Sequence, residues 1–297
     1  MSAPAIRTSL RLDALDAAGL DAACCSHADA VLIDLASAAA YAQRAEARRA
    51  GNHALLAIAA TGRPVHARVS DTRSGETEGD IMSMVRAGLG AVVLAGAERP
   101  QDTRELDVLI RKQEMRRGIE PGSVRLIAEL DSATGIRALP AMLDAIDRHS
   151  AVTLDLSALA ASLRLPGAVA SQLPLLEHAM SEVALACSAH ALSWMVAAPA
   201  ADPGARALLA NRAHALGAAG TQIASEAEAS GFTRLFTPPP AALHAAHAIL
   251  DEWARLVATE QPSGVTGPHL VDRRTMRAAR LVVDAHDAIA RRERVRA

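Results

Sequence analysis

The sequence predicts a (β/α)8 TIM barrel, a closed α/β fold, followed by one extra C-terminal helix. Short apolar runs alternate about eight times with alanine-rich helical stretches, and the chain of 297 residues has the length that such a barrel needs. The candidate strands are mostly continuous apolar runs, as expected where both faces of a parallel sheet are covered. Hydrophobic residues make up 51% of the chain, which is ample for a buried core.

Each candidate strand is a short apolar run, and each is followed by a helical pattern. We predict strands at 8–12, 30–35, 64–69, 91–94, 124–129, 151–156, 193–196 and 221–224. We predict helices at 15–25, 38–50, 80–87, 102–117, 136–149, 173–190, 203–216 and 240–256. The order of these elements is that of repeated strand–helix units.

The pattern breaks after Leu256, and a last helix follows from Arg273. We therefore assign residues 1–256 to the barrel and residues 257–297 to a C-terminal loop and helix. In that helix Leu281, Ala285 and Ile289 lie four apart and form an apolar stripe. Because the eight units are complete before this helix, we expect the stripe to pack on a neighbouring subunit.

The charge pattern argues against several classes of partner. The net charge is −2, with acids and bases mixed along the chain, so a nucleic-acid partner is not expected. No run of 18 apolar residues and no signal peptide occur, so we expect no membrane partner and a cytoplasmic location. Three cysteines are too few for a disulfide framework in a chain of this size.

Several stretches resemble, in the right order, the motifs of the citrate lyase β-subunit family. This family also holds malyl-CoA lyase-like proteins and is related to the HpcH/HpaI aldolases. The stretches are "HADAVLIDL", "VHARVSDTRSGETEGDI", "LGAVVLAGAERPQD", "LDSATGI", "ALAASLRL", "LFTPPPAALHAAHAIL" and "HLVDRRTMRAARLVV". The resemblance implies a barrel whose active site lies at the carboxyl ends of the strands and holds Mg²⁺. It also implies a C–C lyase reaction on an oxo-acid or acyl-CoA, and a homo-trimer or hexamer.

The resemblance assigns roles to particular positions. It implies that Arg68 is the catalytic cation that binds substrate oxygens, with Ser70 beside it in place of an asparagine. It implies that Asp131 is one Mg²⁺ ligand, one methylene shorter than the family's glutamate. The second metal carboxylate falls on Ala158, and Asp155 is the candidate replacement three residues earlier. Mg²⁺ prefers such hard oxygen ligands.

Each of these residues also has a structural interpretation. Arg68 at a strand end suits an ion pair as well as a ligand. Asp131 suits a cap for the helix that follows from Ser132. Asp34, the last acid of the second strand, suits hydrogen bonds to the neighbouring loop.

Other polar positions of the family are lost in this chain. Two acids after the second strand fall on Ala36 and Ser37, and a Pro-Lys pair falls on Ala95 and Gly96. Such groups stabilise the enolate that C–C cleavage leaves, each by about 2–4 kcal/mol in the transition state. Their joint loss predicts weak catalysis or none.

Two functional hypotheses follow. In the first, the chain is a degenerate family member that binds a small carboxylate or acyl-CoA ligand, alone or as the partner of an active paralogue. In the alternative, it is an active lyase or CoA-thioester hydrolase with a metal site rebuilt around Arg68, Asp131 and Asp155. Bound Mg²⁺ would favour the second hypothesis.

Overall fold

The computed structural model describes residues 6–37, 41–166, 169–198 and 202–296. The chain divides into two compact units, one spanning Ile6–Leu235 and a second that begins at Phe236. The predicted boundary after residue 256 places the helix at 240–256 with the barrel, whereas in the structure this helix belongs to the second unit with the C-terminal segment.

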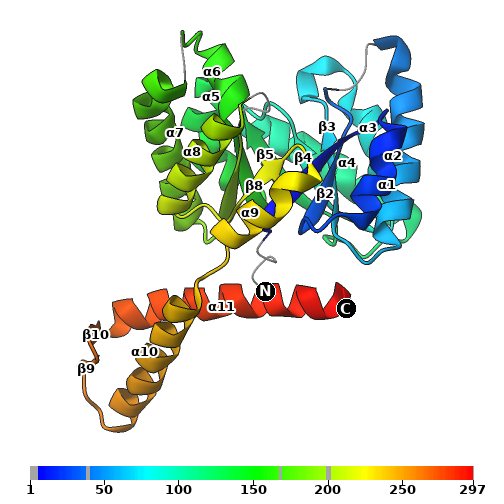
Figure 1. The fold of residues 1–297 in the computed structure, drawn as a ribbon. Helices are drawn as coiled ribbons and strands as arrows, with labels where there is room; N and C mark the ends of the chain where they lie inside the picture. The colour runs from blue at the N-terminus through cyan, green and yellow to red at the C-terminus, as the bar shows by residue number, and fades with distance from the viewer. Residues whose placement is uncertain (1–5, 38–40, 167–168, 199–201, 297) are drawn as a thin grey trace. The chain divides into compact units, whose positions relative to one another are not determined.

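The first unit is a closed barrel of eight parallel strands in the order β1 to β8, which confirms the predicted fold (Figure 1). Every predicted strand overlaps an observed one. The strands are β1 Thr8–Asp13, β2 Ala30–Asp34, β3 Val65–Val69, β4 Leu89–Leu94, β5 Arg125–Leu130, β6 His149–Asp155, β7 Ser193–Ala197 and β8 Gly220–Ile223.

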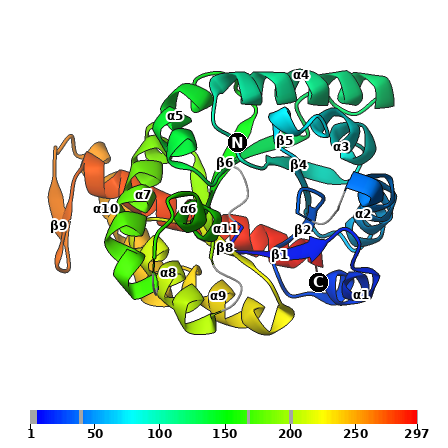
Figure 2. The ribbon, with the colours of Figure 1, turned by 90° about the horizontal axis from the view of Figure 1, so that it is seen from above.

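Helices surround this barrel, as the view from above shows (Figure 2). They are α1 Ala17–Cys25, α2 Arg44–Ala59, α3 Thr77–Met84, α4 Pro100–Arg117, α5 Ala133–Leu143, α6 Leu156–Ser162, α7 Val169–Ala189, α8 Pro203–Ala215 and α9 Ala229–Leu235. Three single-turn 3₁₀ helices occur at η1 Tyr41–Gln43, η2 Thr72–Ser74 and η3 Glu226–Glu228. α8 begins at Pro203 as predicted, whereas α4 begins at Pro100, two residues before the predicted start; proline suits the first turn of both helices.

The core has two layers that follow from the alternation of side chains along each strand. One cluster joins Leu32 of β2, Ala91 and Val93 of β4, Ile127 of β5 and Ala151 of β6. Between the strands and the outer helices lie fully buried side chains of α2 and α4, among them Leu55, Ile58, Leu106 and Ile110. This apolar packing leaves the strand ends free to carry polar groups.

The second unit is a helical pair with a short hairpin between its helices. It contains α10 Pro240–Ala258, β9 Gly264–Thr266, β10 His269–Val271 and α11 Arg273–Arg296. β9 and β10 pair antiparallel within a segment that the sequence analysis treats as a loop. Ala279 and Val283 of α11 pack with Ala246 of α10, so α10 covers part of the apolar face of α11. Leu281, in the stripe noted above, stays 70% exposed.

None of the described helices is both long and apolar enough to cross a membrane.

We expect the exposed part of α11 to be an interface between copies of the chain. Replacing Leu281 with Asp places a charge at an exposed side chain, so the α10–α11 pair should stay folded while the oligomer dissociates. Sedimentation velocity should show a smaller species for Leu281→Asp, and also for a chain that lacks residues 268–297. Leu185→Asp on α7 is the matched control, because Leu185 is 72% exposed. A wild-type chain that sediments as a monomer would contradict this expectation.

Candidate ligand site at the barrel mouth

Arg68, near the carboxyl end of β3, crosses the barrel interior to reach two acids. Its Nε donates to Oε1 of Glu129 at 2.7 Å, and its Nη2 lies 2.6 Å from the same oxygen. Its Nη1 donates to Oδ1 of Asp34 at 3.2 Å. Glu129 lies on β5, which is not adjacent to β3 in the barrel, so this contact shows that Arg68 points inward.

Asp34 receives a second guanidinium from β1. Arg11 donates through Nε to Oδ2 of Asp34 at 2.8 Å, and both arginines also donate to the hydroxyl of Ser37. Oδ1 of Asp34 accepts the backbone N–H groups of Ala36 and Ser37, so the predicted hydrogen bonds to the neighbouring loop are present. Two cations and two carboxylates therefore form one balanced network, which we call the Arg68 network (Arg11, Asp34, Ser37, Arg68 and Glu129).

Burial and charge act against each other in this network. Burial works to raise the pKa of Asp34, but Arg68 and Arg11 outweigh it and hold that pKa below its usual value. Complete burial raises the pKa of Glu129 even though Arg68 opposes the rise. The second oxygen of Glu129, Oε2, has no hydrogen-bond partner within the described part of the chain. Arg68 thus stays charged, and its charge is already engaged by protein groups.

A pocket of about 240 Å³ opens beside this network, where β2, β3, β4 and β5 end. It contains three of the residues named from the sequence, Arg68, Ser70 and Asp131. We call it the β2–β5 pocket; its walls are formed by Ala36, Ser37, Arg44, Arg68, Ser70, Asp71, Arg73, Ser74, Ala95, Gly96 and Asp131.

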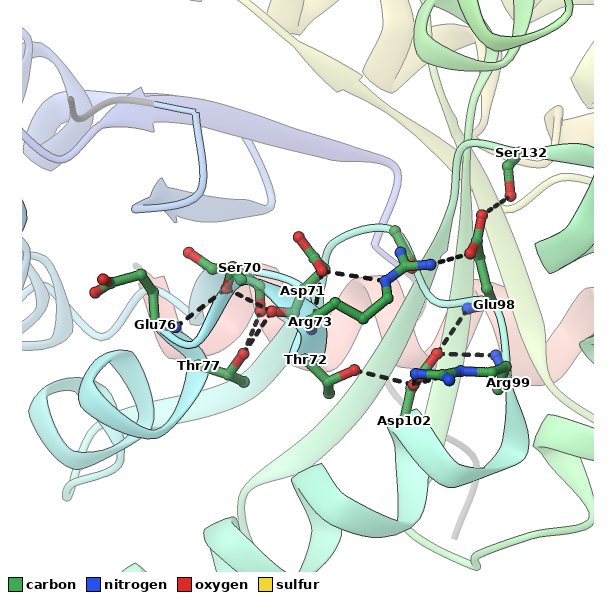
Figure 3. Close-up of polar contacts among 12 residues, drawn as sticks. Ser70, Asp71, Thr72, Arg73, Glu76, Thr77, Glu98, Arg99, Asp102 and Ser132 are labelled. Carbon is green, nitrogen blue, oxygen red and sulfur yellow. Dashed lines mark hydrogen bonds and ion pairs between the residues drawn. The ribbon is translucent and has the colours of Figure 1, made fainter. Parts of the chain in front are cut away.

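Hydrogen bonds and ion pairs join three loops at the edge of this pocket (Figure 3). Arg73, after β3, pairs with Glu98, after β4, and Glu98 accepts a hydrogen bond from Ser132, after β5, at 2.7 Å. Nη2 of Arg73 also donates to the carbonyl oxygen of Gly96 at 3.2 Å. Thr72 donates to Asp102 at the start of α4 at 2.9 Å, a further link between the first two loops. Hydrogen bonds and ion pairs therefore hold the loops at the rim of the pocket together.

Asp131 follows β5 directly and has no hydrogen bond or ion pair to any residue that the structure describes. The interpretation of Asp131 as a helix cap is wrong, because Ser132 is the N-cap of α5 and accepts from the N–H of Gly135. Burial raises the pKa of Asp131, and the negative charges of Asp155 and Glu98 raise it further, against the opposing charges of Arg68 and Arg73. Asp131 is thus a carboxylate that feels both signs of charge and forms no ion pair with a described residue.

Asp155 ends β6 and is engaged by the backbone that follows. Its Oδ1 accepts the N–H groups of Ser157 and Ala158 at 3.0 and 2.9 Å, so Asp155 caps α6. It lines a second pocket of about 210 Å³, together with Arg11, Ser157, Ala197, Ala198, Arg206, Gln222, Ile223 and Ala224. Asp131 and Asp155 are close enough to interact electrostatically, but they line different pockets.

The side chains present do not fit the Mg²⁺ site that the resemblance implies. No group of three or more His, Cys, Asp or Glu side chains among the described residues has a metal-binding arrangement. Ala158 stands where the second carboxylate is expected, and one oxygen of Asp155 is occupied by the α6 cap. Mg²⁺ requires near-octahedral oxygen ligation, for which Asp131 alone is a sparse protein contribution.

Sequence reasoning missed three residues of this site. Glu129 is the single acid of an apolar strand, two positions after Ile127 and hence on the same inward face. Arg11 is likewise the single basic residue of β1 and stands between two leucines. Arg44 opens α2 and donates through Nη1 to the carbonyl oxygen of Leu35 and to Oγ of Ser70.

We expect the loss of Arg68 to destabilise the barrel strongly. In Arg68→Met, Glu129 loses the partner of a buried ion pair and must stay charged or take up a proton, and removing one partner of such a pair costs about 3–5 kcal/mol. Urea unfolding should show this loss, and Arg68→Met combined with Glu129→Met should recover most of it. The control is Arg73→Met, because Arg73 is largely exposed and its ion pair is worth about 1 kcal/mol or less. Equal losses for the two single variants would contradict this account.

Comparisons with solved structures agree with the fold. A citrate lyase from Burkholderia xenovorans matches with a TM-score of 0.79 at 16% identity, over 98% of this chain and 93% of that one. The CitE protein of Mycobacterium tuberculosis, solved with magnesium, acetoacetate and coenzyme A, matches with a TM-score of 0.67 at 20% identity, over 95% of this chain and 98% of that one. RipC from Yersinia pestis matches with a TM-score of 0.63 at 20% identity, over 80% of this chain and 97% of that one.

No curated protein sequence matches this one at a significant level. The profile of one family does match, over residues 7–225, which is well over half of the chain and contains the whole barrel mouth. The chain therefore belongs to the HpcH/HpaI aldolase/citrate lyase family.

Proposed function

We propose that the barrel mouth of this chain binds a small carboxylate and cleaves C–C bonds weakly or not at all. One observation carries the proposal: the charge of Arg68 is taken up by Asp34 and Glu129 inside the barrel. An arginine that must hold substrate oxygens is more effective when its donors are free to face the ligand. Here Nε and Nη2 of Arg68 face Glu129, and Nη1 faces Asp34.

The other walls of the β2–β5 pocket support this proposal. Ala36, Ala95 and Gly96 line it, and these side chains have neither charge nor hydrogen-bonding capacity. An enolate formed against these three residues would find no charged side chain and no side-chain hydrogen-bond donor there to stabilise it. The remaining polar side chains, among them Arg44, Ser37 and Ser70, suit binding of a carboxylate by hydrogen bonds.

The ligand class that we propose is taken from the ligands bound in related structures. The Mycobacterium tuberculosis structures hold acetoacetate with coenzyme A, or oxaloacetate, each with magnesium. We infer that an oxo-acid or its CoA thioester is the ligand class to test first. We also propose, from the resemblance to the family, that the chain forms a homo-trimer or hexamer or a complex with an active paralogue.

The alternative function is an active lyase or CoA-thioester hydrolase with a metal site rebuilt at Arg68, Asp131 and Asp155. It is favoured by the unpartnered carboxylate of Asp131 and by its electrostatic interaction with Asp155. Under this alternative, Mg²⁺ binding and turnover would both depend on these two aspartates.

The purified chain should cleave malyl-CoA and citramalyl-CoA below the usual kcat range of about 1–1,000 s⁻¹, with Mg²⁺ present. The rate should not change in Asp131→Asn. Formation of glyoxylate or pyruvate, followed as its phenylhydrazone, measures C–C cleavage in both chains, and a thiol reagent measures separately any coenzyme A freed by thioester hydrolysis. A kcat inside that range that is lost in Asp131→Asn would instead support the alternative function.

Restoring the missing carboxylate should create a better cation site. In Ala158→Asp, a second hard oxygen donor stands where the family carries one, so calorimetric Mg²⁺ affinity should rise at least about 10-fold over the wild type. Ala158→Asn supplies a weaker neutral oxygen and is the matched control. Equal Mg²⁺ affinity in the wild type and in Ala158→Asp would show that position 158 does not face the cation.

A further inference from the structure

The β2–β5 pocket contains one cation and one carboxylate that the protein does not neutralise. Of its arginines, Arg68 pairs with Asp34 and Glu129, and Arg73 pairs with Glu98 and Asp71. Arg44 has no carboxylate partner in the described ranges. Asp131 has no cationic partner there either.

Arg44 is placed to bind an anion. It uses Nη1 for two neutral oxygens, the carbonyl of Leu35 at 2.9 Å and Oγ of Ser70 at 2.8 Å. A guanidinium has five N–H donors in a planar fork that matches a carboxylate. Ser70 and Ser37 accept hydrogen bonds from arginines, so each still has its own hydroxyl proton to donate to an anion.

Asp131 is placed to bind a cation. Asp155 and Glu98 raise its pKa, while Arg68 and Arg73 oppose them from a distance because each is paired with another acid, so a positive group in direct contact with Asp131 is favoured. Gly96 leaves its carboxylate open, because a Cβ at Gly96 would lie 3.3 Å from Oδ2 of Asp131. A side chain at position 96 would therefore crowd that oxygen.

The cation that fits Asp131 is an ammonium group rather than Mg²⁺. Mg²⁺ needs several oxygen ligands in near-ideal geometry, and the residues described around Asp131 do not form such a set. An ammonium group needs hydrogen-bond acceptors, and a single carboxylate makes a charge-assisted bond with it.

We propose that the β2–β5 pocket binds a small zwitterion of the α-amino acid class, with its carboxylate on Arg44 and its ammonium group on Asp131. The volume of about 240 Å³ is below the roughly 300–1,000 Å³ of pockets for drug-sized ligands, which suits so small a molecule. This inference rests on the proposed function, because both take the ligand to be a small carboxylate.

The first test uses the wild-type, full-length chain in buffer with EDTA. Each of the twenty amino acids, at about 10 mM, is screened for a rise in the thermal unfolding midpoint, since a bound ligand stabilises the folded state. The best amino acid is then compared by calorimetry with two derivatives, its N-acetyl form without the ammonium charge and its amide without the carboxylate. We expect each derivative to bind at least about 10-fold more weakly.

The second test assigns the two charges to the two residues. Arg44→Gln should lower the affinity for the amino acid and for its N-acetyl derivative alike, by at least about 10-fold. Asp131→Asn should weaken binding of the amino acid but not of its N-acetyl derivative. The affinities of these two ligands for the variant should then agree within about 2-fold. Arg49→Gln is the matched control, because it removes an exposed positive charge from the same helix. Unfolding midpoints without ligand check that each variant is folded.

The outcomes separate this inference from the proposed function. If succinate or an oxo-acid binds and no amino acid binds more tightly, the zwitterion inference fails while the carboxylate site stands. Tighter binding of an oxo-acid only when Mg²⁺ replaces EDTA would also overturn it, because the metal would then be the cation at Asp131. If neither amino acids nor carboxylates bind, both proposals fail.

Discussion

The ion pairing of Arg68 with Asp34 and Glu129 is the constraint on which the rest of the barrel mouth depends. It joins β2, β3 and β5 across the barrel interior, and β1 joins through Arg11. Since burying one such charge alone is very costly, the four groups must be kept or lost together. The network therefore closes the barrel interior below the pockets. The side chains outside the network are the ones that a ligand can contact.

Those remaining side chains are divided between two pockets. The β2–β5 pocket has Arg44, Asp131 and the serines, and the second pocket has Asp155 and Gln222 beside Arg206, which pairs with Glu228. The family membership of the chain concerns its scaffold, whereas its chemistry depends on these particular groups. A barrel tolerates such change because its apolar core lies below the strand ends and does not depend on them.

The fold was predictable because eight apolar runs and their helices repeat along the chain, and the resemblance to the family placed Arg68 in the site at the strand ends. The partners of Arg68 were harder to foresee. Glu129 meets Arg68 across the barrel, and no local spacing encodes a contact between strands that are not neighbours. Arg44 escaped notice because its role depends on a hydrogen bond to Ser70, which is distant from it in the sequence. Asp155 was named from the sequence, but its capping of α6 depends on a backbone turn that alternation alone does not reveal.

The linked loops around Arg73, Glu98 and Ser132 have a consequence for how any molecule enters and leaves the mouth. Loops that are free in the unbound state lose conformational entropy on binding, and that loss weakens affinity. Here the ordering of three loops is completed during folding, so association begins from a preorganised rim. These three loops should then need no ordering step when a small molecule binds in the β2–β5 pocket.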